Sequence, residues 1–124
     1  FIFTALKNKE NKNMNLTFST TIEGECSIVR LCGKILSDGD IEGLSSHIDQ
    51  LSNWKVVFDL TDLTHINSSG ISVFVKTMTK CRINQGDLFI SNPNKMINQL
   101  FEITKMNEVF SIYNSNEAAL NQFK

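Results

Sequence analysis

The sequence has almost no net charge. Its 12 Lys and Arg residues are balanced by 13 Asp and Glu residues, which gives a formal net charge of −1 over 124 residues. The positive charges are scattered, and no aromatic residues interleave with them. Proteins that bind nucleic acid or an anionic membrane usually carry a basic patch. We therefore expect no nucleic acid and no membrane among the partners of this chain.

Long apolar runs are also missing. No stretch approaches the roughly 20 apolar residues that a membrane-spanning helix needs. Residues 1–6 are too short for a signal-peptide core and lack a basic flank before them. We interpret residues 1–13 as an N-terminal extension or tail. Residues 14–124 are assigned to one domain, because a hydrophobic content of 41% over 124 residues suits one compact domain.

Cysteine is scarce, with residues at positions 26, 32 and 81 only. None belongs to a CxxC pair or lies near a histidine at ligand spacing, so the sequence indicates neither a disulfide framework nor a metal site. We expect buried, reduced thiols, which favour a reducing compartment and a cytoplasmic location. Gly-rich phosphate loops of the standard patterns are absent as well. We predict no cofactor and no small-molecule substrate.

What the sequence does contain is a regular alternation of strand and helix patterns. Two strand patterns separated by a Glu23-Gly24 turn come first, and helical and strand patterns then alternate to the end of the chain. This predicts a single α/β domain with a mixed, mostly parallel sheet of about five strands and about four helices, in the order β-β-α-β-α-β-α-β-α. The expected strands are residues 16–22, 26–32, 55–60, 88–90 and 109–112, and the expected helices cover 41–51, 68–84, a segment begun by Asn92-Pro93, and a segment capped by Asn114 with Glu117.

The most informative segment is residues 56–70. An apolar run leads through a short polar turn into Asn67-Ser68-Ser69-Gly70, and a helical pattern of Ile71, Phe74, Val75 and Met78 follows at once. Two hydroxyl groups therefore lie at the N-terminus of a helix, beyond the end of an interior strand. Free backbone N–H groups and the positive end of the helix dipole favour a negative group there. An accessible serine at this position is a candidate phosphorylation switch.

These segments, taken together, resemble the STAS domains, and especially the bacterial anti-sigma factor antagonists. The resemblance extends from about Leu16 to the C-terminus and implies the STAS fold. Order, spacing and context agree most closely at the strand, turn, Ser-Ser-Gly and helix block. The matching segments are residues 29–33, 56–70, 92–101, 110–113 and 117–120.

The resemblance also implies a function. In that family, an anti-sigma factor with serine-kinase activity phosphorylates the first hydroxyl residue of an Asp-Ser-Ser-Gly turn. The unphosphorylated antagonist binds the anti-sigma factor and so releases a sigma factor, and phosphorylation ends that binding. The match places the phosphoacceptor at Ser68 and puts Asn67 where the family usually has aspartate. The resemblance thus implies a non-enzymatic, phosphorylation-regulated binding module.

The partner surface is expected around the same turn. We predict that Asn67, Ser69 and Gly70 belong to it, together with Asp38 in the preceding loop. The family often has an acidic residue in that loop, and only Asp38 or Asp40 is available here. Helical geometry places the inward residues of the 68–84 helix in the core. The residues expected on its outer side, and so in the partner surface, are Ser72, Val73 and Lys76.

Other interpretations remain open at this point. The alternative function is a constitutive STAS adaptor subunit of a signalling or lipid-transport assembly, in which Ser68 is never modified. Ser68 and Ser69 are also suitable as helix caps. His65 precedes Ser68 by three residues but is expected to be an exposed loop residue. Asp59 and Asp62 flank the end of a strand, where α/β sheets commonly bind metals or nucleotides.

Overall fold

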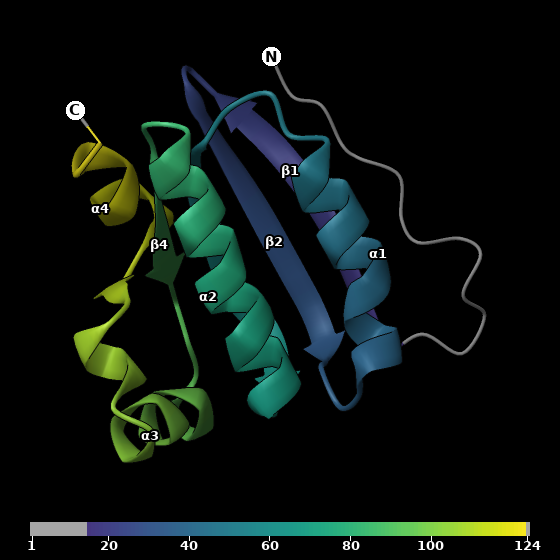
Figure 1. Ribbon diagram of the computed structural model, residues 1–124. Coiled ribbons are helices and arrows are strands. Elements are labelled where there is room, and N and C mark those ends of the chain that lie inside the picture. Colours follow the sequence, from purple (N-terminus) through teal and green to yellow (C-terminus); the bar gives the residue numbers. More distant parts are fainter. Residues whose placement is uncertain (1–14, 124) are drawn as a thin grey trace.

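Strands and helices alternate along the chain in the predicted order. The computed structural model describes residues 15–123, so the interpretation of residues 1–13 as a tail lies outside the described part of the chain. Figure 1 shows the helices packed on a central sheet. The elements are β1 (Leu16–Glu23), β2 (Cys26–Lys34), α1 (Asp38–Asp49), β3 (Lys55–His65), α2 (Ser68–Ile83), β4 (Asp87–Ser91), α3 (Lys95–Ile103), the 3₁₀ helix η1 (Met106–Glu108), β5 (Ser111–Tyr113) and α4 (Asn116–Asn121).

The five strands form one mixed sheet in the order β1-β2-β3-β4-β5. Strands β1 and β2 form an antiparallel hairpin, and β2 to β5 are parallel. Crossover connections between parallel strands are right-handed in nearly all proteins. Because each new parallel strand is added on the same side of the previous one, α1, α2 and α3 must all cover the same face. The predicted fold class is confirmed.

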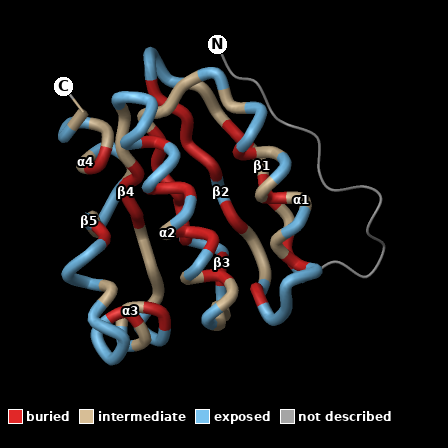
Figure 2. Tube along the Cα trace, viewed as in Figure 1, coloured by how far each residue is buried: buried red, intermediate tan, exposed pale blue. Residues whose placement is uncertain are grey.

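The main core lies between the sheet and helices α1, α2 and α3. Alternate residues of the strands point towards these helices, as the two-residue period of a strand requires. The ring of Phe58 packs edge-on against Phe74 with centroids 5.0 Å apart, and Phe74 meets Phe110 at 6.2 Å. In Figure 2, buried residues, drawn in red, follow the strands and recur along the helices. The fully buried members include Val29, Leu31, Leu44, Val56, Phe58, Leu60, Phe74, Leu88, Ile90, Ile97 and Phe101.

Helix α4 covers part of the opposite face of the sheet. Ala119 is fully buried against Val57 and Phe89, while Leu120 and Phe123 pack around them. The Phe89 and Phe123 rings are stacked, with centroids 4.3 Å apart. Of the apolar residues predicted to be buried by the terminal helix, Ala119 is fully buried, whereas Leu120 and Phe123 are only partly buried.

Strand β3 is longer than predicted. It runs to His65, whereas residues 61–67 were expected to be a turn. Strand β2 also continues two residues beyond its predicted end, and Lys34 pairs with His65 across a register shift. Leu63 is buried between exposed Asp62 and Thr64, which is the alternation of a strand and not of a loop. Strand β2 is long enough to pair with β3 as far as His65. The hydrogen-bonded pairing therefore extends beyond residue 60, where the apolar run used for the sequence prediction ends.

The ends of α1 and α2 also differ from the predictions. Helix α1 begins at Asp38, because Ser37 is its N-cap residue. At the end of α2, the left-handed residue is Gln85, with φ 67°, and not Gly86. Gly86 donates its N–H to the carbonyl of Cys81 at 2.7 Å, which completes a Schellman ending. A Cβ at position 86 would lie 1.9 Å from the Trp54 carbonyl oxygen, so close backbone packing explains this glycine.

Helices α3 and α4 are capped by a neighbour of the predicted residue. Asn94 accepts the Ile97 N–H at 2.8 Å, so Pro93 lies before the cap and not in the first turn of α3. Ser115, in place of Asn114, accepts the Ala118 N–H at 3.0 Å. Adjacent polar residues are equally suitable as caps, so local sequence does not choose between them. The last strand begins at Ser111 because η1 occupies residues 106–108.

Candidate functional site

The turn that begins α2 is held by one bridging side chain. Asn67 is the N-cap residue, and its Oδ1 accepts the Gly70 N–H at 3.1 Å. Its Nδ2 donates to the backbone carbonyl of Leu36 at 2.7 Å. The same amide group therefore caps the helix and ties it to the loop between β2 and α1. Asn67 is therefore the cap of α2, and Ser68 and Ser69 lie inside the helix.

Ser68 is the first residue of α2, and its side chain is exposed. Within residues 15–123 its hydroxyl has no hydrogen-bond partner. It lies next to the N-terminal end of a helix of 16 residues, where unpaired backbone N–H groups favour an anion. The geometry thus leaves this hydroxyl open to another protein.

Ser69 has a different environment. Its Oγ donates to Oδ1 of Asp38 at 2.6 Å, which joins the first turns of α1 and α2. Ser69 is half-buried, whereas Asp38 is exposed. Both acidic candidates lie in the first turn of α1 and not in the loop before it, and Asp38 is the one that contacts the serine turn.

Asp40, the other acidic candidate, is buried and has a structural role. Its Oδ2 accepts the backbone N–H groups of Leu36 at 2.8 Å and Ser37 at 3.1 Å. Asn15 donates to both carboxylate oxygens, at 3.3 and 3.5 Å. With 6% of its surface exposed, Asp40 holds the loop from inside and is not available to a partner.

Gly70 allows close packing beneath the turn. A Cβ at this position would lie 2.5 Å from Cγ1 of Ile66 and 3.1 Å from Cγ2 of Ile35. Both side chains press directly against the backbone of the first turn of α2. Gly70 is therefore buried support for the turn, not part of its outer surface.

A groove of about 570 Å³ runs between α1 and α2 beside the turn. Five of the residues predicted for the partner surface line it together: Asp38, Ser69, Ser72, Val73 and Lys76. Glu42, Ser45 and Ser46 of α1 form the facing wall. Both walls carry mainly polar side chains, with an apolar contribution from Ile41 and Val73.

The prediction that Val73 lies on the outer side of α2 is wrong. Only 5% of its surface is exposed, because α1 packs against this side of α2. Thr77, one turn later, is also buried and donates its hydroxyl to the Val73 carbonyl at 2.7 Å. Ile71 and Val75, which were predicted as core residues, are only partly buried. The buried face of α2 is rotated towards α1, whose position local periodicity does not reveal.

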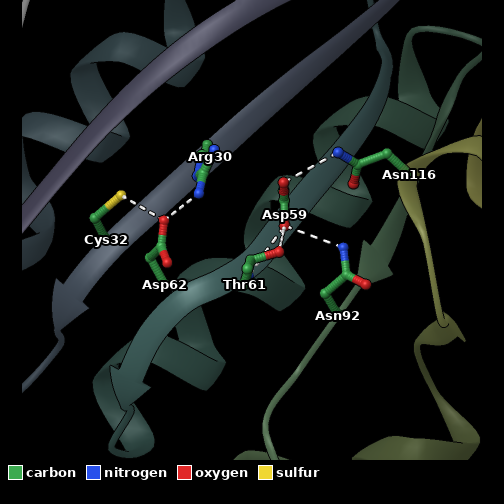
Figure 3. A network of polar contacts seen from close by, with 7 residues as sticks. All are labelled: Arg30, Cys32, Asp59, Thr61, Asp62, Asn92 and Asn116. Atoms are coloured by element: carbon green, nitrogen blue, oxygen red, sulfur yellow. Dashed lines mark hydrogen bonds and ion pairs between the residues drawn. The ribbon is translucent and has the colours of Figure 1, made fainter.

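Asp59 and Asp62 belong to two separate polar contacts (Figure 3). Asp59 is buried and accepts from Thr61 Oγ1 at 2.6 Å, Thr61 N–H at 3.0 Å, Asn116 Nδ2 at 3.0 Å and Asn92 Nδ2 at 3.3 Å. Burial raises the pKa of Asp59, but the hydrogen bonds from Thr61, Asn116 and Asn92 outweigh this effect, so its pKa lies below the ordinary value. The Asp59 carboxylate therefore joins β3 to Asn92, which follows β4, and to Asn116, the first residue of α4.

Asp62 is exposed and pairs with Arg30 on the neighbouring strand. The Cys32 thiol lies 3.9 Å from the same carboxylate oxygen. Among residues 15–123, no group of three or more His, Cys, Asp or Glu side chains is arranged to hold a metal ion. The two aspartates lie within β3 and not at its end, and both are engaged by protein donors.

The location of His65 and the burial of Cys32 differ from the predictions. His65 is half-buried at the end of β3 and not in an exposed loop, and its Nδ1 lies 2.9 Å from Thr64 Oγ1. None of the three cysteines forms a disulfide bond, but Cys32 is only partly buried, because it points to the face of the sheet that the first three helices leave open. No helix within the described part of the chain is long and apolar enough to cross a membrane.

The sequence is similar to those of two proteins named as anti-sigma factor antagonists. BtrV of Bordetella bronchiseptica, named as an anti-sigma factor antagonist, is 32% identical over 81 residues, which cover 65% of this chain and 69% of BtrV. The anti-sigma-B factor antagonist of Staphylococcus aureus is 24% identical over 106 residues, covering 84% and 98% of the two chains.

The fold is similar to that of the Bacillus protein SpoIIAA in its phosphorylated form, with a TM-score of 0.67 at 17% identity, covering 86% of this chain and 99% of that one. The anti-sigma factor antagonist SpoIIAA in its unphosphorylated form gives a TM-score of 0.69 at the same identity, covering 85% and 94%. The STAS domain model matches residues 17–119. The chain therefore belongs to the STAS domain family.

Proposed function

We propose that this chain is an anti-sigma factor antagonist controlled by phosphorylation of Ser68. In this proposal the unmodified chain binds an anti-sigma factor that is also a serine kinase, and a sigma factor is released. Phosphorylation of Ser68 by the same partner ends the binding. The chain itself is a binding module and not an enzyme.

The exposed hydroxyl of Ser68 at the start of α2 is the observation that carries the proposal. Two curated relatives are named anti-sigma factor antagonists, and a protein of similar fold has been described in a phosphorylated form. Within this family, an exposed serine at the N-terminus of a helix is suited to accept a phosphoryl group without rearrangement of the fold.

The physical effect of phosphorylation falls on the partner and not on the fold. A phosphoserine adds roughly −1.5 to −2 charges near neutral pH. At an exposed helix N-terminus, such charge is stabilising by about 0.3–1 kcal/mol. A partner that covers the turn must instead bury a dianion, which costs several kcal/mol unless the partner supplies compensating groups. A loss of about 3 kcal/mol in binding lowers the affinity by roughly a hundredfold.

The proposed surface consists of the turn and the groove beside it. Asn67, Ser68 and Ser69 form the turn, and Asp38, Ser72 and Lys76 extend it along the groove. Gly70 and Val73 are both buried, and of the two only Val73 lines the groove, with 5% of its surface exposed. Their contribution is to shape the surface from below.

Two experiments test the proposal. The protein is incubated with the kinase-type anti-sigma factor of its own organism and ATP, and the modified residue is located by mass spectrometry. We expect label on Ser68 and none on Ser68→Ala. Label on another residue, or none at all, contradicts the switch and favours the constitutive adaptor.

Binding of Ser68→Glu is measured beside that of Ser52→Glu, which adds the same charge at an exposed position in the loop between α1 and β3. We expect Ser68→Glu to bind at least about tenfold more weakly than the wild type. Ser52→Glu should bind as the wild type does. Equal binding of Ser68→Glu and wild type would refute the proposed mechanism.

A further inference from the structure

Two segments of the chain run side by side as they pass from strand to helix. Thr64 Oγ1 donates to the Gly33 carbonyl at 3.0 Å, and the contacts from Asn67 to Leu36 and from Ser69 to Asp38 follow. All three contacts join residues 31 positions apart in the sequence. The parallel register of β2 and β3 is therefore continued by side chains into the first turns of α1 and α2.

Asn67 is the central contact of this series, and it uses both ends of its amide group. The Oδ1 atom accepts the Gly70 N–H, while Nδ2 donates to the Leu36 carbonyl. An ionised aspartate accepts hydrogen bonds but cannot donate one. Aspartate here would cap α2 equally well, but it would place a carboxylate oxygen against the carbonyl oxygen of Leu36. The bridge to the loop thus depends on asparagine.

We propose that Asn67 is a positioning residue, which locks residues 36–38 against the first turn of α2. Asp38, held by Ser69, and the exposed Ser68 then form one preformed surface contributed by the first turns of α1 and α2. A preformed surface binds with a smaller loss of conformational entropy than one that must be ordered on contact. The consequence for binding rests on the proposed function, whereas the locking of the loop does not.

Amide hydrogen exchange of residues 36–40 tests the locking directly. Asn67→Asp keeps the cap acceptor and removes the donor. We expect these amides to exchange about fivefold faster in this variant, the ratio that corresponds to the typical net contribution of one hydrogen bond. Asn67→Ser also keeps a cap acceptor, but its short hydroxyl does not reach Leu36. A similar acceleration in this uncharged variant attributes the effect to the lost bridge and not to charge repulsion.

Asn94→Asp is the matched control. Asn94 caps α3 in the same way and donates its Nδ2 to the carbonyls of Leu63 at 3.2 Å and Thr64 at 3.3 Å. The same chemical change is therefore made at another bridging N-cap. Exchange of residues 36–40 should stay at the wild-type rate in this control. Unchanged exchange in Asn67→Asp, or equal acceleration in Asn94→Asp, overturns the inference.

A binding measurement separates this inference from the proposed function. With the unphosphorylated protein and its anti-sigma factor, Asn67→Asp should weaken binding about fivefold, mainly through a slower association rate, because the loop must be ordered during docking. If Ser68→Glu binds like the wild type, the proposed function fails, and the exchange result still decides whether Asn67 positions the loop. If exchange accelerates while binding is unchanged, the loop is not part of the binding surface, and the functional half of the inference is rejected.

Discussion

Replacing Asp59 by alanine provides a demanding test of the structure. The Asp59 carboxylate is 5% exposed and accepts four hydrogen bonds from three residues on separate segments: Thr61, Asn92 and Asn116. Asp59→Ala removes all four and leaves the amide groups of Asn92 and Asn116 without their acceptor. Removing one partner from a buried charged contact typically costs about 3–5 kcal/mol. Asn92 and Asn116 are half-buried and gain some hydration, so we expect about 3 kcal/mol.

The measurement is urea unfolding at pH 7, with the thermal midpoint as a second observable. For a domain of this size, about 3 kcal/mol corresponds to a fall in Tm of roughly 10 °C. Because Asn116 is the first residue of α4, hydrogen exchange should increase in α4 more than in α1. The control is Asp62→Ala, which removes an exposed carboxylate paired with Arg30 and should cost less than about 1 kcal/mol.

The pH dependence provides an independent check on Asp59. Its folded pKa is lowered below the ordinary value of 3.8, so its contribution is present above that pH and is lost as the pH falls through the folded pKa. Asp59→Asn, which cannot ionise, should lack this part of the acid dependence. If Asp59→Ala costs less than about 1 kcal/mol, or if its acid unfolding profile matches that of the wild type, the described network does not contribute as argued.

Three further predictions concern residues outside the serine turn. Ser27 is fully buried and its hydroxyl has no hydrogen-bond partner among the described residues, so Ser27→Ala should raise the free energy of unfolding by about 1 kcal/mol in urea titrations, and a loss would contradict this. Burial lowers the pKa of His47 below 6.5, so folding stability should fall as the pH is lowered through 6, and His47→Gln should remove that slope from thermal melts between pH 7 and 5. Burial raises the pKa of Cys81 to about 12, so iodoacetamide at pH 8 should label the partly exposed Cys32 first, as peptide mass spectrometry would show, and faster labelling of Cys81 would contradict its burial.

Much of the fold is predictable from local pattern alone. The order of the elements follows from the change between two-residue and 3.6-residue periods, and the parallel sheet follows from the alternation of strands and helices. Element ends are less predictable, because neighbouring residues such as Asn114 and Ser115 are both good caps. The C-terminal part of β3 was missed because its ladder depends on the partner strand β2 and not on its own apolar content.

The candidate site was predicted in part. The position of Ser68 at the start of a helix follows from the sequence between residues 56 and 78. The contact between Ser69 and Asp38 joins residues 31 positions apart, and no local pattern contains it. The burial of Val73 depends on where α1 packs, which is likewise set by tertiary structure. The sequence therefore locates Ser68, the proposed phosphoacceptor, but does not reveal which residues form the surface around it.

The placement of α4 has a practical consequence for experiments. In Figure 1, α4 lies at one end of the sheet, whereas the start of α2 and helix α3 lie at the opposite end. A fluorophore or affinity handle attached after α4 is therefore remote from Ser68, so immobilised protein should keep its serine turn open to incoming macromolecules. Attachment within α3 or near Leu36 would crowd that approach, and such preparations should capture less of the anti-sigma factor.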